Sequence, residues 1–179
     1  MQQHIALLAR YNAWMNTKLY DAAATLSQQA LALDRGAFFG SILGTLNHIV
    51  VGDTLWLKRF ATLPVQPAAL ATLEAVRQLP NPAGLDEVLF TDLTALRQRR
   101  TLLDEAISAW VAALTAADLA ANLDYANTKG VAQNKPVDSL LLHFFNHQTH
   151  HRGQATTLLA QAGVDVGVTD LVALIPNAP

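Results

Sequence analysis

Five of the six histidines in this 179-residue chain fall in two segments with helical patterns of apolar residues, and such imidazoles could bind a metal ion. Four of them are His143, His147, His150 and His151, and the fifth is His48. The apolar stripe of the later segment advances by three or four residues, through Leu140, Phe144, His147, His151, Ala155, Leu158 and Ala162. Residues at i and i+4 lie one turn apart on the same face, so His147 and His151 can converge on a single ion.

A third ligand has to come from a facing helix, and His48 is the only histidine inside another segment that reads as a helix interior. Gly44 and Gly52 lie one turn before and after it, and each costs roughly 1 kcal/mol relative to alanine. Room for an inward-pointing imidazole would explain these glycines, and so would the close approach of another backbone. We therefore predict that His48, His147 and His151 hold one divalent ion. The alternative is that all three are hydrogen-bonded core residues without a metal.

Several polar side chains near these histidines are further candidates for lining the site. Gln154 shares a helix edge with His143 and His147, and a metal-bound imidazole usually donates its second N–H group to an acceptor. Asn12 and Asn16 are i,i+4 neighbours beside the stripe of the first helix, where they could line the cavity or form a polar flank. The catalytic residues stay unassigned, with Asn12, Asn16, His143 and Gln154 as candidates.

Acidic residues provide no obvious general base on the histidine stripes. Asp53 follows His48 by five residues, which places it roughly 140° around the helix, so we predict that it makes a structural hydrogen bond. Gln148 stands where an H-E-x-x-H motif has its catalytic glutamate. The sequence therefore does not fit the zinc-protease motif.

The histidines must be positioned by four helices, which the apolar periodicity predicts at about 5–26, 38–61, 86–114 and 136–162. Prolines break the long connection 63–85, which we expect to contain at most a short helical piece around 70–79. Residues 122–135 form either a short β-hairpin with a turn at 127–130 or a plain loop. Gly163 is placed to end the last helix, and 169–175 could add one more turn. The fold class is all-α, one four-helix bundle domain over 1–179.

The composition excludes several classes of function. Hydrophobic residues make up 51% of the chain and charged residues 15%, and there is no cysteine, which rules out disulfides and thiolate metal ligands. The net charge of −2 gives no footprint for nucleic acid, and we interpret Arg97, Arg99 and Arg100 as a solvated helix face. No apolar run reaches the roughly 18 residues of a membrane span. The first residues lack the pattern of a signal peptide, so we expect a cytoplasmic protein.

Four segments together carry a family resemblance. The run from His143 to Gln154, HFFNHQTHHRGQ, resembles the fourth-helix signature of the DinB family, also called the DinB/YfiT-like superfamily. Three further segments match in the same order: YNAW at 11–14, LNHI at 46–49 with Asp53 and Trp56, and YANTKG at 125–130. The matching segments span nearly the whole chain.

The resemblance implies a bundle in up-down-down-up order, with a metal held by His48, His147 and His151 and water completing its ligand shell. It also implies a homodimer. Some relatives are similar to metal-dependent thiol transferases, which use low-molecular-weight thiols such as bacillithiol or mycothiol. The family name points to the response to DNA damage, a form of stress.

Three imidazoles and an open position are typical of catalytic rather than structural zinc sites. A divalent ion there would lower the pKa of bound water or of an incoming thiol. Because the chain has no cysteine, the thiol would arrive as a cosubstrate, and we predict a transferase that joins it to a small electrophile. Zinc or nickel would suit the ligands. The alternatives are a non-catalytic metal-binding protein of the stress response and a metal-dependent hydrolase.

Overall fold

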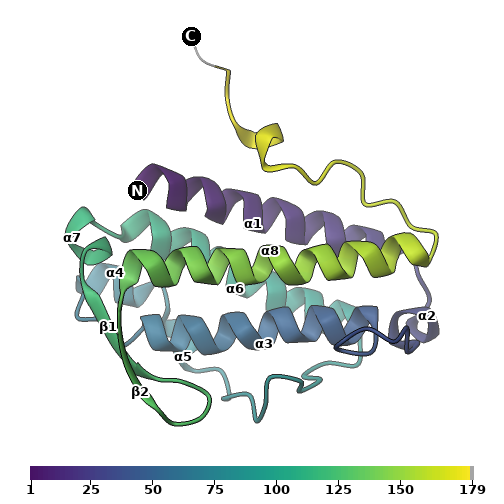
Figure 1. Cartoon of the computed structure of the whole chain (residues 1–179), viewed down its shortest axis with the longest axis horizontal. Helices are drawn as coiled ribbons and strands as arrows, with labels where there is room; N and C mark the ends of the chain where they lie inside the picture. The colour runs from purple at the N-terminus through teal and green to yellow at the C-terminus, as the bar shows by residue number, and fades with distance from the viewer. Residues whose placement is uncertain (178–179) are drawn as a thin grey trace.

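Four long helices lie side by side in the computed structural model, which describes residues 1–177 (Figure 1). They are α1 (Gln2–Ala23), α3 (Ile42–Phe60), α6 (Leu93–Ala113) and α8 (Val137–Gln161). Helix α1 packs against α6 and α8, and α3 packs against the same two helices. The end of the predicted 1–179 domain, at residues 178 and 179, lies outside the described residues. The chain is therefore mostly helical, as predicted.

Large aromatic side chains fill the core where α3, α6 and α8 meet. Phe60 stacks on Trp110 with ring centroids 4.8 Å apart and meets Phe144 edge-on at 5.8 Å, and all three rings are fully buried. Burying an aromatic ring stabilises a fold by a few kcal/mol. This cluster holds α3 and α8, the two helices with the histidines, in a fixed relation. No helix within 1–177 is long and apolar enough to cross a membrane.

A two-stranded antiparallel sheet precedes α8 and confirms the hairpin rather than the plain loop. Strand β1 (Asn122–Ala126) pairs with β2 (Ala132–Pro136), in a register that sets Tyr125 opposite Gln133. In the turn, the side chain of Asn127 accepts from two backbone N–H groups, and Gly130 takes a positive φ of 76°. Strand β2 runs directly into α8, so the hairpin lies beside the start of the histidine helix (Figure 1).

Two helices begin later than the sequence predicts. Helix α3 starts at Ile42 instead of 38, because Gly40 has a φ of 70° and Ser41 caps the helix by accepting from the Gly44 N–H group. Helix α6 starts at Leu93 instead of 86, where Asp92 is the cap. Residues 86–92 are instead tied to α3, since the side chain of Asn47 bonds both the N–H and the carbonyl of Phe90.

The remaining elements are short. They are α2 (Gln28–Ala32), α4 (Pro67–Ala71), α5 (Glu74–Arg77), α7 (Ala116–Leu119) and the 3-10 helix η1 (Leu171–Leu174). Helices α4 and α5 interrupt the long connection, and η1 is the extra turn expected in the tail. Helix α1 ends at Ala23, three residues before Leu26, and Gly163 follows α8 with a positive φ of 81°.

Arg100 corrects the interpretation of the basic cluster as a solvated helix face. Its side chain is buried and pairs with Asp53 at 2.5 Å and with Asp104 at 3.1 Å. Burial lowers the pKa of Arg100, but the carboxylates of Asp104 and Asp53 outweigh this and raise it above the ordinary value. Asp53 therefore makes the structural hydrogen bond that its position on the helix predicts. Arg97 does lie at the surface, paired with Asp21.

Candidate metal centre

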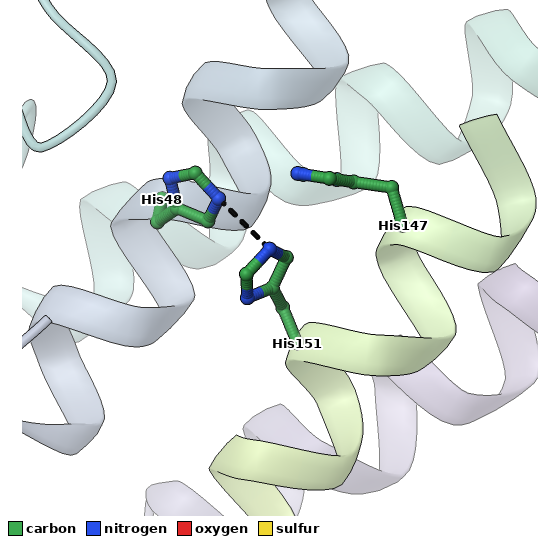
Figure 2. A group of neighbouring side chains, drawn as sticks. All are labelled: His48, His147 and His151. Carbon is green, nitrogen blue, oxygen red and sulfur yellow. Dashed lines mark hydrogen bonds between the residues drawn. The ribbon is translucent and has the colours of Figure 1, made fainter. Parts of the chain in front are cut away.

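Three imidazoles from two helices converge on one space. His48 comes from α3, and His147 and His151 come from successive turns of α8 (Figure 2). One ring nitrogen of each residue lies within 4.8 Å of the others, and the Nε2 atoms of His48 and His151 are 3.1 Å apart. His48 is buried and the other two are partly exposed. These three histidines could therefore hold one metal ion, as the i,i+4 spacing on α8 and the place of His48 predict.

Outer hydrogen bonds set the tautomers of two of these rings. The Nδ1 atom of His48 lies 2.7 Å from the carbonyl oxygen of Leu85, and that of His151 lies 2.8 Å from Oε1 of Gln154. Both oxygens can only accept, so each Nδ1 carries the proton and each neutral ring turns an unprotonated Nε2 toward the centre. Gln154 thus takes the role of acceptor that the sequence allows for it.

The chemistry of this arrangement fits a divalent cation. Two unprotonated Nε2 atoms facing each other at 3.1 Å repel unless a positive charge lies between them. Imidazole nitrogens that bind one tetrahedral zinc ion lie about 3.3 Å apart, given zinc–nitrogen bonds of about 2.0–2.1 Å. The His48 and His151 nitrogens are already near that spacing, and the His147 nitrogen, which lies within 4.8 Å of both, would have to move inward to complete such a site.

Phe39 supports the site although nothing in the sequence pointed to it. Its ring stacks on that of His48 with centroids 3.8 Å apart and planes 16° from parallel, and it meets His151 edge-on at 5.5 Å. Phe39 lies in the loop before α3, where the sequence predicted helix. Because Phe39 was expected on a helix, there was no reason to place its ring against His48 from a loop.

The two glycines around His48 have different structural reasons. A Cβ atom at Gly44 would overlap the carbonyl oxygen of Phe39, so this glycine allows close approach of the backbone. A Cβ atom at Gly52 would lie 3.0 Å from Cε1 of His147, so this glycine makes room for an imidazole of α8. Both explanations offered by the sequence therefore hold, each at one glycine.

Gly52→Ala should weaken metal binding by about 10- to 100-fold, the range that follows from disturbing the orientation of a metal ligand. The added methyl group pushes on the ring of His147. Gly153→Ala is the matched control, because that position on α8 is open within 4 Å and gains roughly 1 kcal/mol of helix propensity. Zinc affinity measured by competition with a chelating dye checks both variants. Equal affinities in the two would show that Gly52 does not position His147.

All three rings are held in the neutral form that metal binding requires. Burial, together with the neighbouring histidines, lowers the pKa of His147 to about 3. Burial also lowers the pKa values of His48 and His151. Protons therefore compete weakly for these nitrogens near neutral pH.

The metal-free protein should lose stability as the pH falls from 7 to 5. The pKa of His147 is lowered to about 3 in the folded chain, against about 6.5 in the unfolded chain, so only the unfolded chain takes up the proton in this interval. The contribution of the neutral His147 ring to the free energy of unfolding is fully present above pH 6.5 and declines as the pH falls toward 3. Urea titrations in the presence of a chelator measure the trend. His147→Leu should make the decline shallower, and an unchanged slope would exclude His147 as its source.

Two pockets open beside the histidines. One of about 410 Å³ is lined by all three of them, together with Phe38, Phe39, Leu85 and Asp86. The other, of about 240 Å³, shares His147 and Leu85 with the first and is lined in part by Gly52, Trp56, Arg59, Tyr125 and His143. His147 thus lines both pockets, and His143 lines the second, as its place among the candidate lining residues predicts.

Asn12 and Asn16 do not join the histidines. Both are fully buried and donate to Asp104, at 3.0 and 2.9 Å, and the side chain of Arg152 donates to Asn12. Burial raises the pKa of Asp104, and Arg100 opposes this. The pair lies neither at the cavity nor on a polar flank, but in a buried network between α1, α6 and α8. His4 and His150 are exposed.

Comparison with known proteins gives one consistent result. The model of the DinB family matches residues 1–178. The chain is 26% identical over 170 residues to "Protein DinB" of Bacillus subtilis (strain 168). The aligned region covers 91% of this chain and 88% of that protein. No solved structure matches the chain significantly.

Proposed function

The chain belongs to the DinB family, and from this premise we propose that it is a metal-dependent transferase that joins a low-molecular-weight thiol to a small electrophile. In this proposal His48, His147 and His151 hold one divalent ion. Zinc or nickel would suit three imidazoles, since both ions bind nitrogen ligands well.

The observation that carries the proposal is an open set of three ligands. Within residues 1–177, no further histidine, cysteine, aspartate or glutamate joins the three histidines in a ligand cluster. All three line a pocket of about 410 Å³. Structural zinc sites usually have four protein ligands and no open position, so this combination favours catalysis over a purely structural ion.

The residues of the chain have defined tasks in this proposal. Leu85 and Gln154 hold the protons on Nδ1 of His48 and His151, and Phe39 restrains the His48 ring. When bound, a divalent ion would lower the pKa of a thiol and so supply a strong nucleophile near neutral pH. The thiol has to arrive on a cosubstrate, because the chain contains no cysteine.

A product assay tests the proposal. Protein loaded with zinc or nickel is incubated with glutathione, bacillithiol or mycothiol and a halogenated or epoxide electrophile, and thioether products are measured by mass spectrometry. We expect product formation that requires both metal and thiol. Metal-bound protein that forms no product with any of the thiols would favour a non-catalytic protein. Substrate cleavage without a thiol would favour a hydrolase.

The finer features of the family also belong to this proposal. We propose the up-down-down-up order, which is supported by the return of residues 61–92 along the bundle from the end of α3 to the start of α6 (Figure 1). We also propose a single domain, a homodimer and a cytoplasmic protein of the stress response, on the strength of the family resemblance. Light scattering of the purified chain measures its oligomeric state.

A further inference from the structure

We infer that the pocket beside His147 binds the carboxylate of a small apolar acid through Arg59. This inference deepens the proposed function, because it takes the acid to be the electrophilic substrate. Arg59 lies in the last turn of α3, and its guanidinium carbon is 4.7 Å from the centre of the Trp56 ring and 5.2 Å from that of Tyr125. The two rings, one from α3 and one from β1, fix the position of a side chain that is otherwise flexible.

The guanidinium of Arg59 has no anionic partner among residues 1–177. No carboxylate lies within ion-pair distance, and its N–H groups make no hydrogen bond within that range. Arg77, Arg97 and Arg100, by contrast, each pair with at least one acidic side chain. A partly buried cation with five free donors and a fixed orientation is an anion-binding group.

The location of Arg59 connects this group to the metal centre. It lines the 240 Å³ pocket together with His147, so an anion held there lies in the same cavity as a proposed metal ligand. A neighbouring pocket of about 480 Å³ shares Trp56, Tyr125 and His143 with it, and its other lining residues are Lys135, Pro136, Ser139 and Leu140. Its walls are largely apolar, and they suit the hydrocarbon or aromatic part of the ligand.

A carboxylate fits this site better than a phosphate group. The planar fork of arginine forms bidentate pairs with carboxylates and phosphates alike, so the charge of the anion decides between them. A phosphate dianion would be only partly neutralised, because Arg59 is the one guanidinium that lines the 240 Å³ pocket within the described chain. The aromatic walls then select acids with an apolar body.

Binding of phenylacetate, compared with its neutral analogue phenylacetamide, tests the inference. Dissociation constants are measured from the indole N–H signal of Trp56 in NMR titrations of the full chain, as purified and after removal of metal. We expect phenylacetate to bind roughly 10- to 100-fold more tightly in both forms, as a charged hydrogen-bonded pair would give. Phenylphosphate, the third probe, should bind more weakly than phenylacetate.

Three variants separate the role of Arg59 from general effects. Arg59→Gln should abolish the preference for the acid, and Arg59→Lys, which keeps the charge but not the fork, should restore only part of it. Arg99→Gln is the matched control, because Arg99 also lies over an aromatic ring, that of Phe90 at 5.3 Å, but lines neither pocket. It should keep the full preference.

The outcomes distinguish this inference from the proposed function. A preference that survives in Arg59→Gln, or that disappears when metal is removed, would overturn the inference, because the acid would then bind elsewhere or to the ion. Equal binding of acid and amide would overturn it as well, as would tighter binding of phenylphosphate. If the preference holds but no thiol product forms with any electrophile, the acid site stands and the transferase proposal fails.

Discussion

His147→Ala should reduce the metal content of the purified protein from about one ion per chain to almost none. The imidazole of His147 is one of the three proposed ligands, so its removal should lower the affinity by more than the 10- to 100-fold that loss of an outer hydrogen-bond partner costs. Metal analysis by mass spectrometry, on protein without a polyhistidine tag, measures the content directly. Formation of thioether product should fall in parallel.

Thermal unfolding gives an independent measure of the same variant. A ligand at 1,000 times its dissociation constant stabilises the folded state by about 4 kcal/mol, so added zinc should raise the unfolding temperature of the unaltered chain by several degrees. His147→Ala should show no such rise. His4→Ala is the control, because His4 is exposed on α1 and should leave metal content and the temperature shift unchanged. Metal content in His147→Ala equal to that of the control would refute the three-histidine site.

Arg100→Met should destabilise the fold strongly, although Arg100 lies outside the aromatic core. It leaves the carboxylates of Asp53 and Asp104 without the buried cation between them, and breaking a buried ion pair costs about 3–5 kcal/mol. Urea titration at pH 7 measures the free energy of unfolding. The metal ligands themselves are untouched, so metal affinity of the folded variant should change little.

The same helix provides the matched control for this variant. Arg97→Met removes an ion pair with Asp21 in which both side chains are well exposed, and such pairs contribute at most about 1 kcal/mol. Similar losses of stability in the two variants would show that the buried network adds no more than a surface pair. A large loss for Arg100→Met alone would establish the network as a main support of the bundle.

The helical phase of the sequence was enough to find the three histidines, because a ligand pair at i,i+4 leaves a signal in one short segment. The partners of Nδ1 were harder to find. Gln154 could be predicted, since it lies on the same helix as His151. The carbonyl of Leu85 could not, because it belongs to an irregular connection and every residue there has a carbonyl that could accept. Phe39 was missed because the helix was predicted to begin before it.

Arg100 shows how local patterns can conflict. Its neighbours Arg97 and Arg99 suggest a solvated charged face, but the stripe through Leu96 and Leu103 places Arg100 toward the core. Its partner Asp53 lies 47 residues away, so only the packed structure decides between the two patterns. The same holds for Asn12 and Asn16, whose partner Asp104 lies about 90 residues further along the chain.

The hydrogen bond from His48 to Leu85 has a consequence for how this chain tolerates mutation. The acceptor is a main-chain oxygen, so no substitution of the Leu85 side chain removes it, and an alanine scan of the long connection would pass over it. Deleting one residue there, however, would move the oxygen out of reach. Over generations the identity of residue 85 is therefore free to drift, while the length and path of the connection that carries it are not.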